Sequence, residues 1–183
     1  MSKTHAKTDP TLASFALSDG RSLALYDWSQ SRAPRGVVLI VHGLGEHARR
    51  YDRLATRLQG WGFHVRAYDQ RGHGQSGGYR GVLPADNALL DDLQAVLAQT
   101  RAQWVKPCAC PLILLGHSMG GLVAATLVQR VPEAVDALVM SSPALDAGIG
   151  GFKKQLITLL NRWAPNLTLS NGLDARLISH DAD

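Results

Sequence analysis

The chain has 183 residues, of which 45% are hydrophobic and 19% charged, and it carries a formal net charge of +4. This length fits one domain, and this composition excludes a disordered chain. Its Lys and Arg residues are scattered, so we expect no nucleic-acid partner. The N-terminal stretch MSKTHAKTDPTLAS lacks the apolar region of a signal peptide, and no apolar run approaches the roughly 18 residues that span a bilayer. We therefore expect a soluble, cytoplasmic protein.

Hydrophobic periodicity predicts alternating strands and helices along most of the chain. Asp19-Gly20 between two apolar stretches is typical of a hairpin turn, and the continuously apolar run VVLIV indicates a strand buried on both faces. In chain order we expect strands at 12–17, 22–28 and 37–41, a helix at 51–61, a strand at 63–68, a helix at 84–104, a strand at 111–115, a helix at 118–131 and a strand at 137–140. This alternation predicts an α/β fold, in which an N-terminal β-hairpin precedes a mostly parallel sheet with flanking helices.

Two short segments add to this picture. Cys108 and Cys110 lie one residue apart, and without nearby His or Cys partners they make a poor metal site. We expect two free thiols at the entrance of a strand. After Pro143 the pattern changes, because apolar residues in the stretch 152–163 recur at helical spacing until Pro165 ends the segment.

The sharpest motif is Gly116-His117-Ser118-Met119-Gly120, between a predicted strand and a predicted helix. This is G-x-S-x-G in the strand–turn–helix context that gives the motif its meaning. The turn is so tight that the serine takes a strained conformation, and the glycines on either side keep side chains clear. Ser118 Oγ then stands at a helix N-terminus, where backbone N–H groups, including that of Met119, favour developing negative charge. We expect Ser118 to be a nucleophile.

A second motif, HGLGEH at residues 42–47, directly follows the first buried strand. Its glycines let the backbone approach a substrate oxygen, and such a loop can supply the other donor of an oxyanion hole. We assign that donor to the N–H of Leu44. His42 and His47 have no third ligand at a matching spacing, so we expect no metal.

A third motif, RGHGQSGG at residues 71–78, contains the glycine spacing of a dinucleotide fingerprint. That fingerprint must open a helix inside a βαβ unit, whereas here the next predicted helix begins only near Pro84. We therefore expect a structural loop beside the active site, and no cofactor.

In this order and at these spacings, HGLGEH, RGHGQSGG and GHSMGG resemble the monoacylglycerol lipase and lysophospholipase branch of the α/β-hydrolases, a serine aminopeptidase S33-type domain. SSPALDA and SNGLD look like the same branch entering its cap. The resemblance runs from about Phe15 to the end of the chain. It implies the α/β-hydrolase fold, Ser118 as nucleophile, and Leu44 and Met119 as the oxyanion hole. The stretch 152–163 would lie in the cap over an acyl pocket.

The family places its catalytic acid and histidine after the cap, and this sequence ends within the cap. The resemblance therefore implies a chain truncated at its C-terminus, with 1–146 as the N-terminal part of the core and 147–183 as the beginning of the cap. His180 falls in a cap loop, and Asp146 is not at the family's acid position. His117 adjoins the nucleophile, but adjacent residues diverge on such a turn. We assign none of the three as acid or base.

The expected activity is hydrolysis of a carboxylic ester, such as a monoacylglycerol or a lysophospholipid, through an acyl-enzyme on Ser118. Two alternatives stay open: a peptidase of the same fold, and a non-catalytic fragment without the acid and the base. The expected partner is a small lipid or ester substrate, and the cap could also touch a membrane surface. The periodicity of 152–163 equally fits an ordinary helix that packs on the domain.

Overall fold

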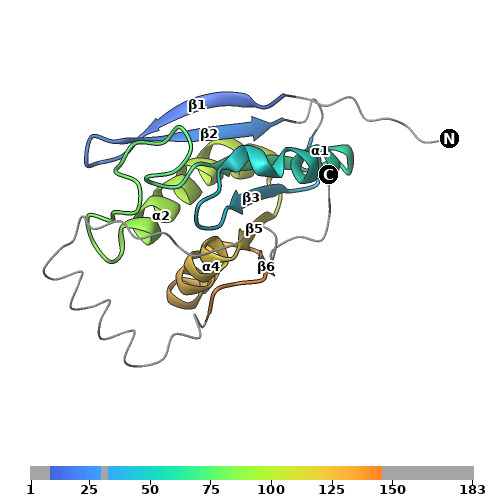
Figure 1. Cartoon of the computed structure of the whole chain (residues 1–183). Coiled ribbons are helices and arrows are strands. Elements are labelled where there is room, and N and C mark those ends of the chain that lie inside the picture. Colours follow the sequence, from blue (N-terminus) through green and yellow to red (C-terminus); the bar gives the residue numbers. More distant parts are fainter. Residues whose placement is uncertain (1–8, 30–32, 146–183) are drawn as a thin grey trace, which may run out of the picture. The chain divides into compact units, whose positions relative to one another are not determined.

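The computed structural model describes residues 9–29 and 33–145, which form strands and helices in the predicted alternation (Figure 1). The strands are β1 (Thr11–Ala16), β2 (Ser22–Trp28), β3 (Val37–Val41), β4 (His64–Tyr68), β5 (Leu112–His117) and β6 (Ala137–Ser141). The helices are α1 (Asp52–Gly60), α2 (Ala88–Thr100), α3 (Lys106–Cys108) and α4 (Met119–Arg130), with 3-10 turns at Ala48–Tyr51 and Pro132–Ala134. The chain divides into two compact units, Met1–Ala147 and Gly148–Asp183. The predicted helix at 152–163 lies outside the described residues.

The six strands form one sheet in the order β1-β2-β4-β3-β5-β6. β3 pairs in parallel with β4 and β5, and β5 pairs in parallel with β6. The hairpin of β1 and β2 is antiparallel, and β2 joins it to the rest of the sheet by antiparallel pairing with β4. The predicted fold class, a mostly parallel sheet that follows an N-terminal hairpin, is confirmed.

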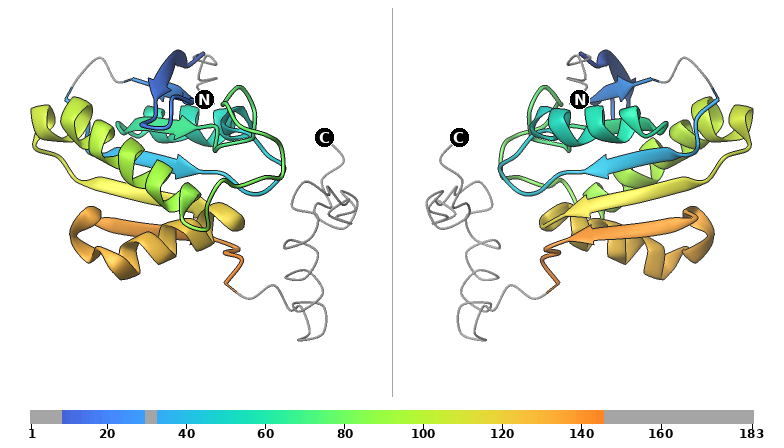
Figure 2. Two further views of the ribbon diagram at one scale, coloured as in Figure 1. Left: turned by 90° about the vertical axis from the view of Figure 1, so that its left-hand side faces the viewer. Right: turned by 90° about the vertical axis from the view of Figure 1, so that its right-hand side faces the viewer.

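Helices cover both faces of this sheet, and this explains why β3 is apolar throughout. Val37, Leu39 and Val41 pack in the same cluster as the buried side chains of α2 and α4, which lie side by side (Figure 2). Val38 and Ile40 point to the other face, where they share a cluster with residues of α1. Because neither face meets water, a period-two pattern gives no advantage, and the strand reads as a continuous apolar run.

One buried strand contains a charge that periodicity did not predict. Arg66 of β4 lies directly opposite Asp27 of β2, and both side chains are buried. The Nε and Nη2 of Arg66 donate to the two carboxylate oxygens of Asp27 at 2.7 Å each. The remaining guanidinium N–H groups reach the Thr100 hydroxyl at 3.3 Å and the side-chain oxygens of Gln99 and Gln103. The pair is therefore fully hydrogen-bonded, which is the condition for burying two charges.

Three details of the elements differ from prediction. The helix expected to begin at Pro84 begins at Ala88, because a hydrogen-bonded turn from Ala88 N–H to the Ala85 carbonyl precedes it. It also continues past Thr100 through a π-helical segment, Arg101–Val105, into α3. The helix expected at 51–61 is shorter, because α1 ends at Gly60, and Trp61 beyond its end is 57% exposed.

The expectation for the cysteines is wrong. Cys108 and Cys110 are joined by a disulfide, with their Cα atoms 5.2 Å apart. Ala109 between them takes a left-handed conformation with φ of 49°, which turns the chain from the end of α3 toward β5. Spacing alone could not reveal this turn, because a pair of cysteines one residue apart is bridged only where the backbone folds back between them.

Candidate active site

Ser118 occupies the single residue between β5 and α4, at the carboxyl end of a central strand. Its backbone has φ of 50° and ψ of −117°, a conformation that is strained for any residue with a side chain. Three backbone hydrogen bonds hold it there. The Ser118 N–H donates to the Ser141 carbonyl of β6 at 3.0 Å, and the Ser118 carbonyl accepts from the N–H groups of Leu122 and Ala144. The sharp turn predicted from G-x-S-x-G is present.

The glycines around Ser118 are required by close approach of the backbone. A Cβ on Gly116 would lie 2.5 Å from the Gly120 carbonyl oxygen. A Cβ on Gly120 would overlap the carbonyl oxygens of Val41 and His42, at the end of β3. The first turn of α4 thus packs directly on the backbone of two strands, which keeps Ser118 raised at the edge of the sheet.

The loop after β3 lies against Ser118, as the second motif predicted. A Cβ on Gly43 would be 3.2 Å from the Ser118 Cβ, a tight contact, so the absence of a side chain at Gly43 helps this loop come so close. Leu44 is 48% exposed, and its N–H donates to no partner among residues 9–29 and 33–145. The N–H of Met119, at the start of α4, is likewise without an acceptor in the described ranges. The structure therefore brings Ser118 and two unused backbone N–H groups to the same end of the sheet.

One histidine in each of the motifs HGLGEH and RGHGQSGG hydrogen-bonds to the backbone and stabilises the two loops. His42 Nε2 accepts the Gln70 N–H at 2.9 Å, so its Nδ1 carries the hydrogen and donates to the Gly43 carbonyl at 2.7 Å. His73 Nε2 accepts the Gly45 N–H at 3.3 Å, and its Nδ1 then donates to a backbone carbonyl, that of Arg71, at 3.0 Å. Burial lowers the pKa of His42 to about 4, so its ring is neutral at physiological pH.

The loop of the third motif is organised by Asp69, which sequence reasoning did not single out. Its buried carboxylate accepts the backbone N–H groups of Ala48 and Gln75 and the hydroxyl of Tyr26, at 2.7, 2.8 and 3.1 Å. Burial, and then the charge of Asp69, raise the pKa of Tyr26 to about 12. A Cβ on Gly74 would overlap the same carboxylate, so this glycine makes room for a side chain and not for a phosphate. The available signal was the position of Asp69 immediately after a buried strand.

Arg71 ties this loop to two other parts of the molecule. Its guanidinium forms a bidentate ion pair with Asp92 of α2, with hydrogen bonds of 2.9 and 2.7 Å. It also donates a hydrogen bond to the carboxylate of Asp19 in the hairpin turn. The hydrogen bonds to Asp92 raise the pKa of Arg71 above its usual value, so the guanidinium stays charged. The helix after this loop begins only at Ala88, so the glycine spacing does not open a helix as a dinucleotide fingerprint does.

Ser118 Oγ makes no hydrogen bond with an acid, a base or any other residue that the structure describes. His117 turns toward β6, where its Nδ1 lies 3.1 Å from the Ser141 hydroxyl. Asp146 and His180 lie outside the described residues. Within the described part of the chain, no three His, Cys, Asp or Glu side chains gather as metal ligands do, and no helix is long and apolar enough to cross a membrane.

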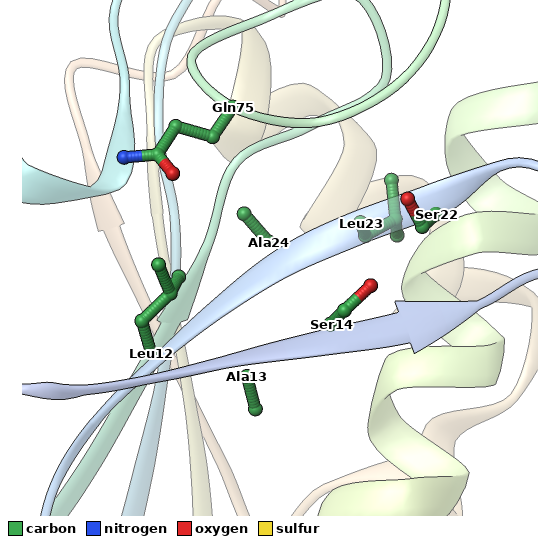
Figure 3. Close-up of a pocket in the computed structure, with 7 residues that line it drawn as sticks. All are labelled: Leu12, Ala13, Ser14, Ser22, Leu23, Ala24 and Gln75. Carbon is green, nitrogen blue, oxygen red and sulfur yellow. The ribbon is translucent and has the colours of Figure 1, made fainter.

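A hollow of about 160 Å³ lies over the N-terminal hairpin (Figure 3). Side chains of β1 and β2, such as Leu12 and Ala24, line it together with Gln75 of the third motif. None of the predicted site residues borders this hollow, so it is distinct from the cluster around Ser118.

Comparison with known proteins shows the family to which the chain belongs. Residues 32–183 match the protein family described as "Serine aminopeptidase, S33". The chain belongs to this family. It is similar to the monoacylglycerol lipase of Mycolicibacterium smegmatis, with 35% identity over 172 residues, and to the human monoglyceride lipase, with 33% identity over 167 residues. These matches cover 93% and 90% of the chain but 60% and 54% of the two relatives, so the chain spans less than two thirds of their length.

Solved structures of similar proteins share the fold. A soluble variant of the monoglyceride lipase of Saccharomyces cerevisiae matches with a TM-score of 0.80 and 24% identity, over 93% of this chain and 58% of that one. The Paleococcus ferrophilus monoacylglycerol lipase matches with a TM-score of 0.67 and 32% identity, over 95% of this chain and 59% of that one. The resemblance inferred from the three motifs is confirmed: the chain is an α/β-hydrolase of the monoacylglycerol lipase-like branch.

Proposed function

We propose that the protein is a serine hydrolase that cleaves carboxylic esters of the monoacylglycerol or lysophospholipid class, with Ser118 as its nucleophile. The observation that carries the proposal is the strained backbone of Ser118 at the junction of β5 and α4, with φ of 50°. Backbone strain persists where surrounding contacts over-determine it, and it gathers at active sites. The similarity to monoacylglycerol lipases supports the substrate class.

In the proposed reaction, Ser118 Oγ attacks the ester carbonyl carbon and gives up its proton to a general base. The N–H groups of Leu44 and Met119 stabilise the negative oxygen of the tetrahedral intermediate. The intermediate expels the alcohol, which takes a proton from the protonated base, and leaves an acyl group on Ser118. Water then attacks the acyl carbon with help from the same base and releases the acid.

The proposal requires a base that the described residues do not supply. His42 and His73 are committed to backbone hydrogen bonds, and His117 faces the Ser141 hydroxyl. A serine hydroxyl is a weak nucleophile without a neighbouring base. We therefore infer that the base comes from a part of the protein outside the described ranges.

We propose that residues 147–183 begin a cap, in which the amphipathic stretch 152–163 shields an apolar acyl pocket. Replacing Phe152 and Leu156 by Ser should then slow turnover of long-chain esters more than that of acetate esters. An equal loss on both substrates would indicate that this stretch only packs on the domain.

The nucleophile is tested with a fluorophosphonate probe on the whole protein as it is encoded. The wild type should be labelled at Ser118, and Ser118→Ala should lose both the label and ester hydrolysis. Ser14→Ala is the matched control, because Ser14 lies on β1, in the hairpin at the edge of the sheet, and this variant should keep both. Labelling of Ser118→Ala at the wild-type rate would refute the assignment.

A peptidase is the second candidate, since the matching family is described as a serine aminopeptidase. Both activities share the acyl-enzyme but differ in the leaving group, because an amine must be protonated before it departs. Parallel assays on a monoacylglycerol, a lysophospholipid and an aminoacyl anilide separate them. Faster turnover of the anilide than of either ester would favour the peptidase.

A further inference from the structure

Glu46 is a half-buried acid in the loop that lies against Ser118, and sequence reasoning gave it no role. One of its carboxylate oxygens, Oε2, accepts two hydrogen bonds, from the Gly43 N–H at 3.0 Å and from the Tyr51 hydroxyl at 2.9 Å. The other oxygen lies 3.5 Å from Nε of Arg50. Both carboxylate oxygens therefore have partners, and the side chain is held on three sides.

These contacts fix the part of the loop that approaches the serine. Residues 43–46 turn back on themselves through Gly45, whose φ of 71° is in the left-handed region. The Glu46 carboxylate closes this turn by occupying the Gly43 N–H. A Cβ on Gly43 would lie 3.2 Å from both the Ser118 Cβ and Glu46 Oε2, so the acid and the serine both lie beside the same glycine.

We propose that Glu46 is a positioning residue, whose carboxylate holds Gly43 in place and thereby aims the Leu44 N–H at the oxygen that becomes negative during catalysis. This inference rests on the proposed function. The N–H of Gly43 is already used, so Leu44 is the next donor along the loop. A donor stabilises the intermediate only when it is aimed before the reaction begins, and a shift of about 1 Å can cost about 10²-fold in rate.

The surroundings of Glu46 keep its carboxylate ionised, so that it can accept hydrogen bonds. Burial opposes its charge, but the hydrogen bonds from Gly43 and Tyr51 and the charge of Arg50 outweigh burial and hold its pKa below the usual range. The group therefore stays ionised at neutral pH and accepts both hydrogen bonds at once.

The test compares Glu46→Ala and Glu46→Gln in the whole protein on a p-nitrophenyl ester, with rates expressed per active site titrated by the fluorophosphonate probe. Glu46→Ala removes the acceptor and should lower kcat about 10- to 100-fold with little change in KM, somewhat less than the loss of an entire oxyanion donor. Glu46→Gln keeps one carbonyl oxygen for Gly43 and Tyr51 and should restore most of kcat. Glu133→Ala is the matched control, since Glu133 is the other glutamate in the chain and is exposed in the turn before β6.

Titration of active sites separates positioning from folding. A glutamate that only stabilised the loop would lower the fraction of titratable protein and leave kcat per site unchanged, and this result would overturn the inference. If Glu46→Ala does not fold, Tyr51→Phe is the second test, because it removes one hydrogen-bond donor to the Glu46 carboxylate. This variant should also lower kcat and leave KM unchanged. A wild type that the probe does not label would instead refute the proposed function, so the two failures are distinguishable.

Discussion

His42 should make the folded protein less stable as the pH falls from 7 to 5. Its ring is 1% exposed, and both ring nitrogens are used, one as acceptor from the Gln70 N–H and one as donor to the Gly43 carbonyl. Adding a proton to Nε2 would break the first of these bonds and place a charge in a buried site. Desolvation is accordingly the main cause of a pKa that falls from the ordinary 6.5 to about 4.

The sign of the effect follows from where each state takes up its proton. The unfolded chain binds a proton at His42 near pH 6.5, and the folded protein binds one only near pH 4. Between these values the unfolded state carries more protons, so the free energy of unfolding decreases as the pH is lowered. For this pKa difference the loss from His42 is about 2 kcal/mol between pH 7 and pH 5, and about 3 kcal/mol once the pH is well below 4.

Urea unfolding at pH 7, 6 and 5 measures this loss. His42→Gln should be less stable at pH 7, because one hydrogen bond is lost, but its free energy of unfolding should fall by about 2 kcal/mol less than that of the wild type between pH 7 and pH 5. His47→Gln is the matched control, because the side chain it removes is exposed and His42 stays buried. Identical pH dependence in the wild type and His42→Gln would refute the claim that the His42 ring is neutral and buried.

Three further substitutions test the site and its support. Leu44→Ala should cost little activity, whereas Leu44→Pro, which removes the N–H, should approach the 10²- to 10³-fold loss in kcat, roughly, of an oxyanion donor; equal ester hydrolysis by both would show that Leu44 only packs. Gly120→Ala should lower both the melting temperature and the labelling of Ser118, because its Cβ would overlap the carbonyl of Val41; an unchanged melting temperature would contradict this. Arg66→Leu should destabilise the protein by about 3–5 kcal/mol in urea unfolding, because the buried carboxylate of Asp27 loses the guanidinium that donates to both of its oxygens and keeps only the His64 ring, 3.7 Å away. Adding Asp27→Leu should recover part of that loss, and simple additivity would show that the two side chains do not interact.

Much of the fold could be predicted because its signals are local. The Asp19-Gly20 turn, the continuous apolar run of β3 and the helical spacing of α2 each reflect contacts within a few residues of the chain. The sharp turn at Ser118 was predictable for the same reason, since glycines two positions on either side are a local steric requirement. An error occurred at Trp61, which continues the helical spacing of α1 but lies beyond the end of that helix.

By itself, the sequence determined the order of strands and helices and the identity of Ser118 and Leu44 as candidates, because side-chain periodicity and glycine requirements act over short distances along the chain. Only the tertiary structure decided which distant residues meet. Asp69 reaches Ala48 across 21 residues and Arg66 reaches Asp27 across 39, and no spacing rule connects such pairs. The role of Glu46 was hidden for the same reason: its loop gains significance only when the sheet brings β3 beside β5 and sets Gly43 against Ser118. Sequence patterns indicate whether a segment forms a helix, a strand or a tight turn, whereas the pairing of strands determines which distant segments come into contact.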